Sequence, residues 1–348
     1  MAAKKIVTIV GARPQFVKAA TLSRAFAAAG DLGETMIHTG QHFDPEMSAV
    51  FFRELGIPAP AHHLDIHGGH HGAMTGRMLE AIERVLLAEA PDWVLVYGDT
   101  NSTLAGALAA AKLNLPVAHV EAGLRSFNRR MPEEINRVLT DHVSRLLFCP
   151  TRTAVANLAA EGITQGVHAV GDVMYDATLD ALGRARTGSA ILDTLGLAPG
   201  SYLLATIHRA ENTDSRAALS AVLNAVRAEA AGRPVVLPLH PRTRQAAERF
   251  GLGLDGLTVI APVGFLDMTR LLGDCAAVLT DSGGVQKEAY FHRKPCVTLR
   301  SETEWVETVE CGWNRLWTEP AYQPRREITD YGDGRAAQAI LQRLREGS

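Results

Sequence analysis

A regular alternation of short apolar runs with longer helical stretches, which occurs twice along the chain, constrains the fold most. The predicted strands of the first half are Lys5–Val10, Thr35–Thr39, Trp93–Tyr97, Val117–Val120, Leu146–Cys149 and His168–Val170. The predicted helices of this half are Thr21–Ala29, Met74–Glu89, Thr103–Lys112 and Glu133–Val143. Near-continuous apolar strands that alternate with helices are typical of a parallel sheet covered on both faces.

The same pattern restarts after residue 200. Its predicted strands are Tyr202–Thr206, Val235–Leu239, Thr258–Ile260, Ala277–Thr280 and Cys296–Leu299. Its predicted helices are Arg216–Ala230, Arg244–Phe250, Leu266–Leu272 and Val285–Tyr290. We therefore predict an α/β protein with two doubly wound domains facing across a cleft, residues 1–171 and 172–348. The last helix is a candidate to pack back on the first domain, and residues 183–200 are predicted to be a variable segment.

Composition excludes several classes of protein. The 348 residues fit two domains of about 150 residues, and 47% hydrophobic and 21% charged residues are typical of a globular chain. A formal net charge of −3 argues against a nucleic-acid partner. No apolar run approaches the ~20 residues of a membrane span, and the N-terminus leads directly into a strand without a signal peptide. We expect a cytoplasmic protein whose four cysteines are buried free thiols.

Ligands of open parallel sheets bind beyond the carboxyl ends of the strands. Among the residues that follow predicted strands here, Asp281-Ser282-Gly283-Gly284 is the most informative run. A strand that ends at Asp281 and a helix that begins in the Ser-Gly-Gly turn would aim free backbone N–H groups at one point, which favours an anion such as phosphate. Glu288, one turn into that helix, is placed to hold vicinal hydroxyls. The alternative is a tight connection without a ligand.

The loop after the first strand, Gly11 to Lys18, contains Arg13, Pro14 and Lys18. Gly11 permits a sharp turn, Pro14 fits a first helical turn, and the two cations suit phosphate. A solvated helix start would explain the same residues. The spacing is neither that of a Walker loop nor G-x-G-x-x-G, so nothing in it supports NAD.

Three carboxylates follow strands of the first domain or open a helix there. Asp99 ends an apolar strand and serves either in chemistry or as a helix N-cap. Glu121 ends the next strand, and two facing carboxylates raise at least one pKa and make an acid/base set. Glu133 opens a helix after a proline, where helix electrostatics alone favours an acid.

Histidines follow two predicted strands of the second domain and also occur in one predicted loop of the first domain. His208-Arg209 and His240-Pro241-Arg242 follow strands, so both histidines are candidates for acid/base or phosphate contacts. A second group of histidines lies close together in a glycine-containing segment that we predict to be a loop: His62, His63, His67, His70 and His71. Their spacing lacks a matching cysteine or carboxylate pair, so we expect no metal.

With these residues in hand, the chain resembles the non-hydrolysing UDP-N-acetylglucosamine 2-epimerase family, which has the Rossmann-like GT-B fold. The resemblance covers nearly the whole chain through seven ordered motifs. They are Gly11-Ala-Arg-Pro14, Thr39-Gly-Gln-His42, Gly98-Asp-Thr100, His119-Val-Glu-Ala-Gly-Leu-Arg125, Pro132-Glu-Glu-Ile-Asn-Arg137, His208-Arg209, and Asp281-Ser-Gly-Gly284 with Glu288.

The resemblance implies anti elimination of UDP from a UDP-sugar to give a 2-acetamidoglycal, followed by re-addition with protonation of C2 from the other face. It implies that the first domain holds the sugar and the acid/base residues and that the second binds UDP, with closure of the domains over the substrate. The implied catalytic residues are Asp99, Glu121, Glu133 and His208. The implied substrate-binding residues are Arg13, Lys18, Arg137, His240, Arg242, Phe265, Ser282, Gly283, Gly284 and Glu288. Gln41, His42 and Arg209 are candidates for an allosteric UDP-sugar site. A homodimer that supplies cell-surface polysaccharide synthesis is expected.

The chain departs from well-known members at two places. The loop between Arg125 and Pro132 is shorter and carries Arg129 and Arg130, and Trp305 stands where those enzymes have arginine. In these features the chain resembles the branch acting on UDP-2,3-diacetamido-glucuronate, since arginines suit a C6 carboxylate. A GT-B glycosyltransferase, a hydrolysing epimerase and a non-catalytic UDP-sugar sensor are the alternatives.

Overall fold

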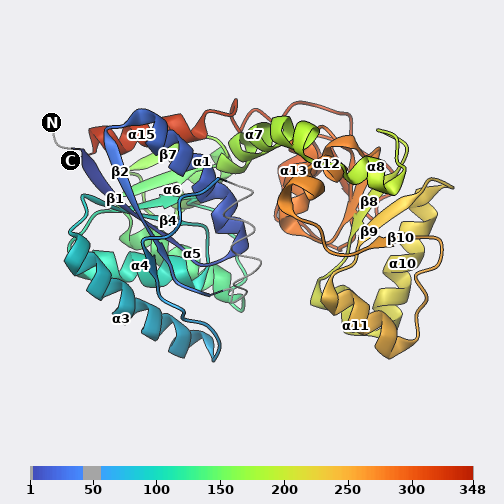
Figure 1. The fold of residues 1–348 in the computed structure, drawn as a ribbon, viewed down its shortest axis with the longest axis horizontal. Coiled ribbons are helices and arrows are strands. Elements are labelled where there is room, and N and C mark those ends of the chain that lie inside the picture. The colour runs from blue at the N-terminus through green and yellow to red at the C-terminus, as the bar shows by residue number, and fades with distance from the viewer. Residues whose placement is uncertain (1–2, 42–55, 348) are drawn as a thin grey trace. The chain divides into compact units, whose positions relative to one another are not determined.

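A computed structural model describes residues 3–41 and 56–347 of the chain. The chain divides into two compact units (Figure 1). Unit 1 comprises Met1–Ala177 and Thr329–Ser348, and unit 2 comprises Thr178–Ile328. The boundary lies inside one helix, and the C-terminal segment returns to unit 1.

The sheet of unit 1 is parallel, with the strand order β3-β2-β1-β4-β5-β6-β7. Its strands are β1 Lys4–Val10, β2 Leu32–His38, β3 His62–His63, β4 Trp93–Tyr97, β5 Val117–Val120, β6 Leu146–Cys149 and β7 Val167–Ala169. The order of the strands reverses between β1 and β4. In doubly wound sheets that reversal opens a crevice at the carboxyl ends of the two strands, which is where ligands bind.

Helices cover both faces of this sheet. They are α1 Arg13–Ala29, α3 His71–Glu89, α4 Asn101–Lys112, α5 Pro132–Val143, α6 Arg152–Ala160 and α15 Ala336–Glu346. Helix α7, Val173–Gly188, begins in unit 1 and ends in unit 2. Val7 and Ile9 of β1 pack against α3 and α4 in one buried cluster. Thr8 points to the opposite face, where it donates to Glu34 beside α1. This alternation is the period of two that a strand imposes.

The C-terminal helix α15 lies against α1, as the red and dark blue helices show (Figure 1). Polar side chains hold both of its ends. Asp176 accepts the backbone N–H groups of Ala336 and Ala337 at the first turn, 3.2 and 2.8 Å away. Lys4 donates to the carbonyl oxygens of Leu344 and Arg345 at the last turn. An acid at a helix start and a cation at its end both stabilise the helix, so these contacts anchor the end of the chain on unit 1.

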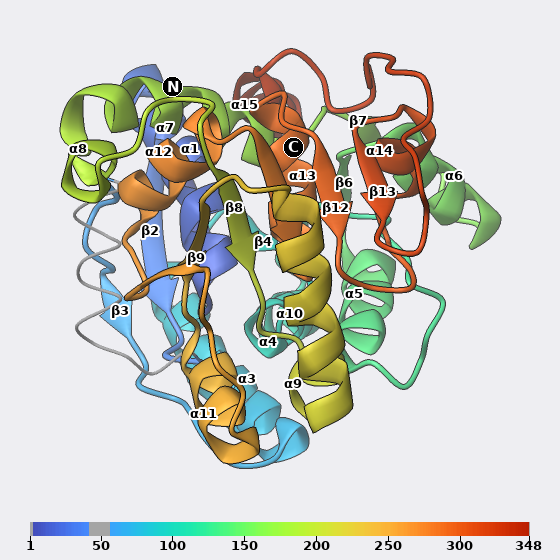
Figure 2. The same cartoon turned by 90° about the vertical axis from the view of Figure 1, so that its right-hand side faces the viewer.

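The sheet of unit 2 is also parallel and has the order β10-β9-β8-β11-β12-β13. Its strands are β8 Leu203–Thr206, β9 Val235–Pro238, β10 Thr258–Ile260, β11 Ala277–Thr280, β12 Cys296–Thr298 and β13 Asn314–Leu316. Its helices are α8 Ile191–Leu195, α9 Ala210–Thr213, α10 Arg216–Ala230, α11 Pro241–Phe250, α12 Phe265–Asp274, α13 Gly283–Phe291 and α14 Val306–Glu310. Leu203 and Ala205 of β8 face α10 and α11, whereas Leu204 faces α8 and α12 (Figure 2).

The apolar alternation predicted most of these elements. The histidine segment is not entirely a loop, because His62 and His63 form β3 and His71 begins α3. The short strand β13 and the helices α6, α7, α8, α9 and α14 were not predicted. Residues 183–200, predicted to be a variable segment, contain the end of α7 and all of α8. Within residues 3–41 and 56–347, no helix combines the length and the apolar character needed to cross a bilayer.

Candidate functional site

The loop after β1 lies at the reversal point of unit 1, and its own backbone is already satisfied. The side-chain oxygen of Gln15 accepts the N–H groups of Gly11 and Ala12 at 2.8 and 3.0 Å, and its amide nitrogen donates to Tyr97 O at 2.8 Å. Gln15 thereby ties the loop to the end of β4. The sequence analysis missed this role, although a Gln three residues after a helix N-cap is a recognised capping signal.

Glu121 and Lys18 form an ion pair at the carboxyl end of β5. Their side chains are 15% and 9% exposed, so little solvent screens the pair. A Cβ atom on Gly98 would lie 3.2 Å from Glu121 Oε2 and 3.6 Å from Lys18 Nζ, so the pair covers Gly98 closely. Glu121 has a φ of +72°, in the left-handed region that non-glycine residues rarely adopt. Strain of this kind clusters at functional sites.

Asp99 follows Gly98 and pairs with a different cation, Arg137 of α5. The same guanidinium donates to Glu134 Oε2 at 2.7 Å, and Asn136 donates to the backbone oxygen of Asp99 at 2.9 Å. Asp99 is not the N-cap of α4, one of the two readings of the sequence. Thr100 is that N-cap and accepts the N–H of Thr103. The Asp99 carboxylate is one-third exposed, so a ligand can reach it.

The two acids that open α5 have different surroundings. Glu133 is exposed. Glu134 is buried and accepts three hydrogen bonds of 2.9 Å, from Ser126 N, Ser126 Oγ and Phe127 N. Burial alone would raise the pKa of Glu134, but these bonds and Arg137 hold it below its ordinary value. Glu134 therefore fastens the loop that carries Arg129 and Arg130, both of which are exposed.

In unit 2, Asp281 organises the loop that follows β8. This fully buried carboxylate accepts the backbone N–H groups of His208 and Arg209 and the side-chain amide of Asn212, with distances of 2.9 to 3.1 Å. Asn212 also donates to Leu299 O at 3.0 Å. The sequence analysis placed Asp281 at a ligand site. In the structure Asp281, which follows β11, holds the residues after β8, and Asn212 extends this link to Leu299 after β12.

His208 and His240 lie side by side, with ring centroids 5.4 Å apart. Burial lowers the pKa of His208, and His240, Arg209 and Arg242 lower it further against the opposing effect of Asp281. His208 is therefore a neutral ring at neutral pH. Arg242 donates to Thr213 and Asp214 at 2.8 and 2.6 Å. These contacts group two imidazoles and two guanidinium-bearing residues at the carboxyl ends of β8 and β9.

Helix α13 begins at Gly283, as the sequence predicts, with Ser282 as its N-cap. A carboxylate lies against its first residue: a Cβ atom on Gly283 would be 2.2 Å from Glu304 Oε1 and 3.7 Å from Arg209 Nη2. Glu304 is also bonded to Arg300 at 2.9 Å. An acidic side chain thus lies where the positive end of the helix attracts anions. Glu288 lies one turn further along α13, and Phe265 begins α12.

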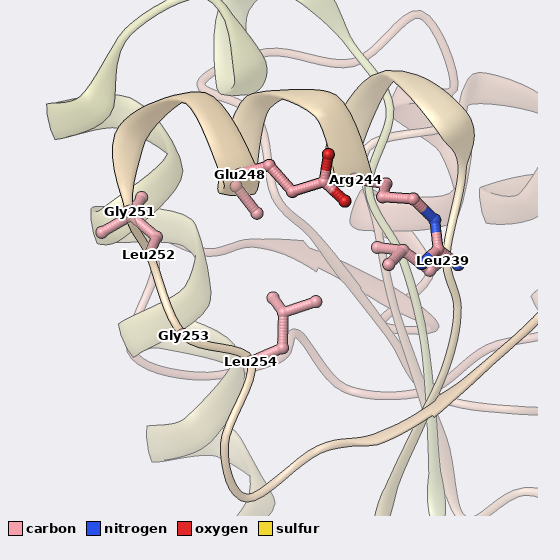
Figure 3. A pocket seen from close by; sticks show the side chains of 8 residues that line it. Leu239, Arg244, Glu248, Gly251, Leu252, Gly253 and Leu254 are labelled. Atoms are coloured by element: carbon pink, nitrogen blue, oxygen red, sulfur yellow. The ribbon is translucent and has the colours of Figure 1, made fainter.

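The larger cavity, about 310 Å³, lies elsewhere in unit 2, between α11 and the loop that follows it (Figure 3). Leu239, Leu252 and Leu254 form its apolar wall, and Arg244 and Glu248 project from α11 beside it. None of the predicted site residues lines it. A much smaller cavity in unit 1 is lined by Lys18, Glu121 and Asp172, among others.

Three further residues predicted to bind ligands are Gln41, Arg13 and His42. Gln41 accepts hydrogen bonds from the N–H and hydroxyl of Ser102, at 3.0 and 2.7 Å, and so covers the start of α4. Arg13 begins α1, but its side chain lies outside the described residues, as does all of His42. In the described part of the chain, no three His, Cys, Asp or Glu side chains are grouped to hold a metal ion.

A family model described as UDP-N-acetylglucosamine 2-epimerase matches residues 24–345. The chain belongs to the UDP-N-acetylglucosamine 2-epimerase family. Within this epimerase family, it is 58% identical over 319 residues to a UDP-2,3-diacetamido-2,3-dideoxy-D-glucuronate 2-epimerase of Pseudomonas aeruginosa, covering 90% of this chain and 88% of that protein. It is 44% identical over 328 residues to a UDP-N-acetylglucosamine 2-epimerase of Methanocaldococcus jannaschii, covering 90% and 88%.

Solved structures of epimerases agree. The crystal structure of the M. jannaschii enzyme in complex with UDP-GlcNAc and UDP matches with a TM-score of 0.86 and 40% identity, covering all of both chains. The Neisseria meningitidis enzyme bound to UDP-GlcNAc matches with a TM-score of 0.87 and 27% identity, covering 99% and 100%. The predicted family and the GT-B fold class are therefore confirmed, and this epimerase is an isomerase.

Proposed function

We propose that the protein interconverts UDP-GlcNAc and UDP-ManNAc without a redox step. A base removes the C2 proton while the C1–O bond to UDP breaks, which gives 2-acetamidoglucal and UDP. UDP then adds back to C1 as an acid delivers a proton to the opposite face of C2. Atoms and charge balance within these two steps, so no cofactor is required.

The observation that carries the proposal is the pair of carboxylates at Gly98 in a chain of this family. Glu121 covers Gly98 and Asp99 follows it. Lys18 pairs with Glu121, and Arg137 pairs with Asp99 and Glu134. We assign the proton transfers to Asp99, Glu121 and the exposed Glu133, since a weakly acidic C2 proton needs a placed base and the other face needs an acid. Arg137 would orient Asp99, and Lys18 would orient Glu121 in addition to its predicted role at the phosphate.

We assign the UDP moiety to unit 2. Ser282, Gly283 and Gly284 at the start of α13 would bind phosphate through backbone N–H groups. His208 is neutral at neutral pH because of its burial and its cationic neighbours. It would donate a hydrogen bond to the leaving diphosphate. His240, Arg242 and Arg13 would help to stabilise the negative charge of that diphosphate. Glu288 would hold the ribose hydroxyls, and Phe265 would complete the nucleotide site.

A UDP-2,3-diacetamido-glucuronate is the second candidate substrate. The 58% identity to the P. aeruginosa enzyme of that name favours it. The loop with Arg129 and Arg130, which Glu134 fastens to α5, would offer guanidinium groups to a C6 carboxylate. The reaction at C2 would be the same.

The sequence also led us to expect a cellular location, an oligomeric state and a regulatory site, and these are part of the proposal. We propose a cytoplasmic homodimer that supplies activated sugars for cell-surface polysaccharide. A regulatory UDP-sugar site would use Gln41, His42 and Arg209. Gln41 would then exchange its bonds with Ser102 for contacts with that ligand.

The deciding experiment is NMR of the purified protein with UDP-GlcNAc in D2O and no added cofactor. Deuterium at C2 together with a UDP-ManNAc signal is the expected result. No reaction with UDP-GlcNAc but exchange at C2 of the diacetamido-glucuronate nucleotide would select the second candidate. Failure with both would contradict the proposed function.

A further inference from the structure

A buried hydrogen bond joins His119 and Asp141, and the assignments above do not use it. His119 lies in β5 and Asp141 in α5, and both side chains are 0% exposed. The distance from His119 Nδ1 to Asp141 Oδ1 is 2.7 Å. Breaking such a buried pair is costly, and its net contribution to stability alone is often small. The pair lies beside the loops that carry Asp99 and Glu121, which suggests that it helps to place these two carboxylates.

Both ring nitrogens of His119 face oxygen acceptors. Nδ1 faces the Asp141 carboxylate, and Nε2 lies 2.7 Å from the carbonyl oxygen of Gly98. A carbonyl oxygen can only accept a hydrogen bond. A neutral imidazole has one N–H and would satisfy one of these acceptors, whereas an imidazolium satisfies both.

The surroundings keep Asp141 charged. Its second oxygen accepts Gly123 N at 3.1 Å and Arg125 Nη1 at 2.7 Å. Burial alone would raise the pKa of Asp141, but His119 and Arg125 hold it below its ordinary value. Arg125 in turn pairs with Glu161 at 2.6 and 2.8 Å. The four side chains alternate in charge, so a cationic His119 completes a neutral chain.

This chain of charges contacts both carboxylate-bearing loops. His119 holds the carbonyl oxygen of Gly98, the residue that precedes Asp99 and lies under Glu121. Asp141 holds Gly123 and Arg125 in the turn that begins with the strained Glu121. One buried pair therefore sets where Asp99 and Glu121 lie relative to each other.

We propose that His119 is an imidazolium in the folded protein and that it and Asp141 are positioning residues, which fix the two carboxylate loops at the spacing that proton transfer at C2 requires. The kinetic part of this proposal rests on the proposed function. The protonation state does not, because it follows from the hydrogen-bond partners alone.

The protonation state is tested on the unmodified protein. Nitrogen-15 NMR of the protein labelled at histidine should show hydrogen on both ring nitrogens of His119 at about pH 7.5, where an exposed imidazole is mostly neutral. The signals are assigned on the unmodified protein through the contact of the His119 ring with Gly98. A His119 nitrogen that lacks hydrogen at this pH would overturn the imidazolium.

The positioning role is tested with H119Q, which can still donate to Gly98 but carries no charge. We expect kcat for C2 exchange to fall by about 10²-fold, as for a misplaced catalytic group, while KM and the affinity for UDP stay within about twofold. H142Q is the matched control, because His142 is the exposed neighbour of Asp141 on α5 and should leave both constants unchanged.

The outcomes separate the two proposals. H119Q with wild-type kcat would refute the positioning role, and so would an equal loss of UDP affinity, which indicates general unfolding. If H119Q does not fold, D141N is measured in its place, and wild-type kcat in that variant would refute the positioning role. An unmodified protein that exchanges no UDP-sugar at C2 contradicts the proposed function but leaves the imidazolium to be judged by NMR.

Discussion

Histidines in the two units lie in opposite electrostatic surroundings. In unit 1, His119 lies between a carboxylate and a carbonyl oxygen, both 2.7 Å away. In unit 2, His208 lies among His240, Arg209 and Arg242, and His292 lies near Lys294 and Arg186. The first environment stabilises a charged ring, and the second favours neutral rings. The same residue type thus serves two purposes in one chain.

The difference extends to the acids. In unit 1 Lys18 pairs with Glu121, and Arg137 pairs with both Asp99 and Glu134. In unit 2 the buried Asp281 accepts backbone and amide N–H groups, and arginines pair with exposed acids, Arg242 with Asp214 and Arg300 with Glu304. The proposed function assigns proton transfer to unit 1 and the diphosphate to unit 2.

The sharpest test of this division is a crossed pair of variants. D99N should lower kcat by about 10³-fold, because it removes an acid/base group, yet leave the affinity for UDP within about threefold. E288A should instead weaken UDP binding by about tenfold through lost bonds to the ribose. Calorimetry with UDP and C2 exchange in D2O measure both. Normal turnover in D99N, or unchanged UDP affinity in E288A, would break the comparison.

The elements that escaped prediction show what sequence patterns omit. Strands β3 and β13 are short and polar, so neither has an apolar run. Asn314 in β13 is buried because Thr298, Thr308 and Gln286 satisfy its side chain, and Arg315 because Glu229 pairs with it. Except for Thr308, these partners lie 16 to 86 residues away in sequence, where periodicity carries no information.

The candidate site divides in the same way. The positions of Asp99, Glu121 and Asp281 were predictable, since each follows an apolar strand of a parallel sheet. Their partners were not. Lys18 lies 103 residues from Glu121, and Asp141 sits on a helix face with no motif of its own. Strand ends can be predicted from local pattern, whereas ion pairs depend on how distant elements pack.

A second prediction extends the comparison to stability. Burial, with Lys294 and Arg186 nearby, lowers the pKa of His292 to about 4, from an ordinary value of 6.5. Between these values the unfolded chain binds more protons than the folded one, so stability falls as the pH is lowered from about 6.5 to about 4. The loss amounts to about 3 kcal/mol.

Urea unfolding followed by tryptophan fluorescence measures this loss, because Trp305, Trp313 and Trp317 all lie in unit 2. H292Q should flatten the dependence on pH in this window, whereas H142Q, at an exposed histidine of unit 1, should not. An equally steep loss in H292Q would assign the effect to other groups and weaken the contrast between the units.

The smallest expected effect concerns an acid at the start of α13, where the proposed function places phosphate. Glu304 lies against Gly283 at the start of α13, where a diphosphate would compete with its carboxylate. E304Q removes that charge and keeps the side-chain shape, so UDP should bind about threefold more tightly, the scale of a surface charge near a helix terminus. E302Q, at an exposed neighbour in the same loop, is the matched control and should change affinity less. Weaker UDP binding by E304Q would show instead that Glu304 supports the site by holding Arg300, 2.9 Å away, and unit 2 would then resemble unit 1 in using paired charges.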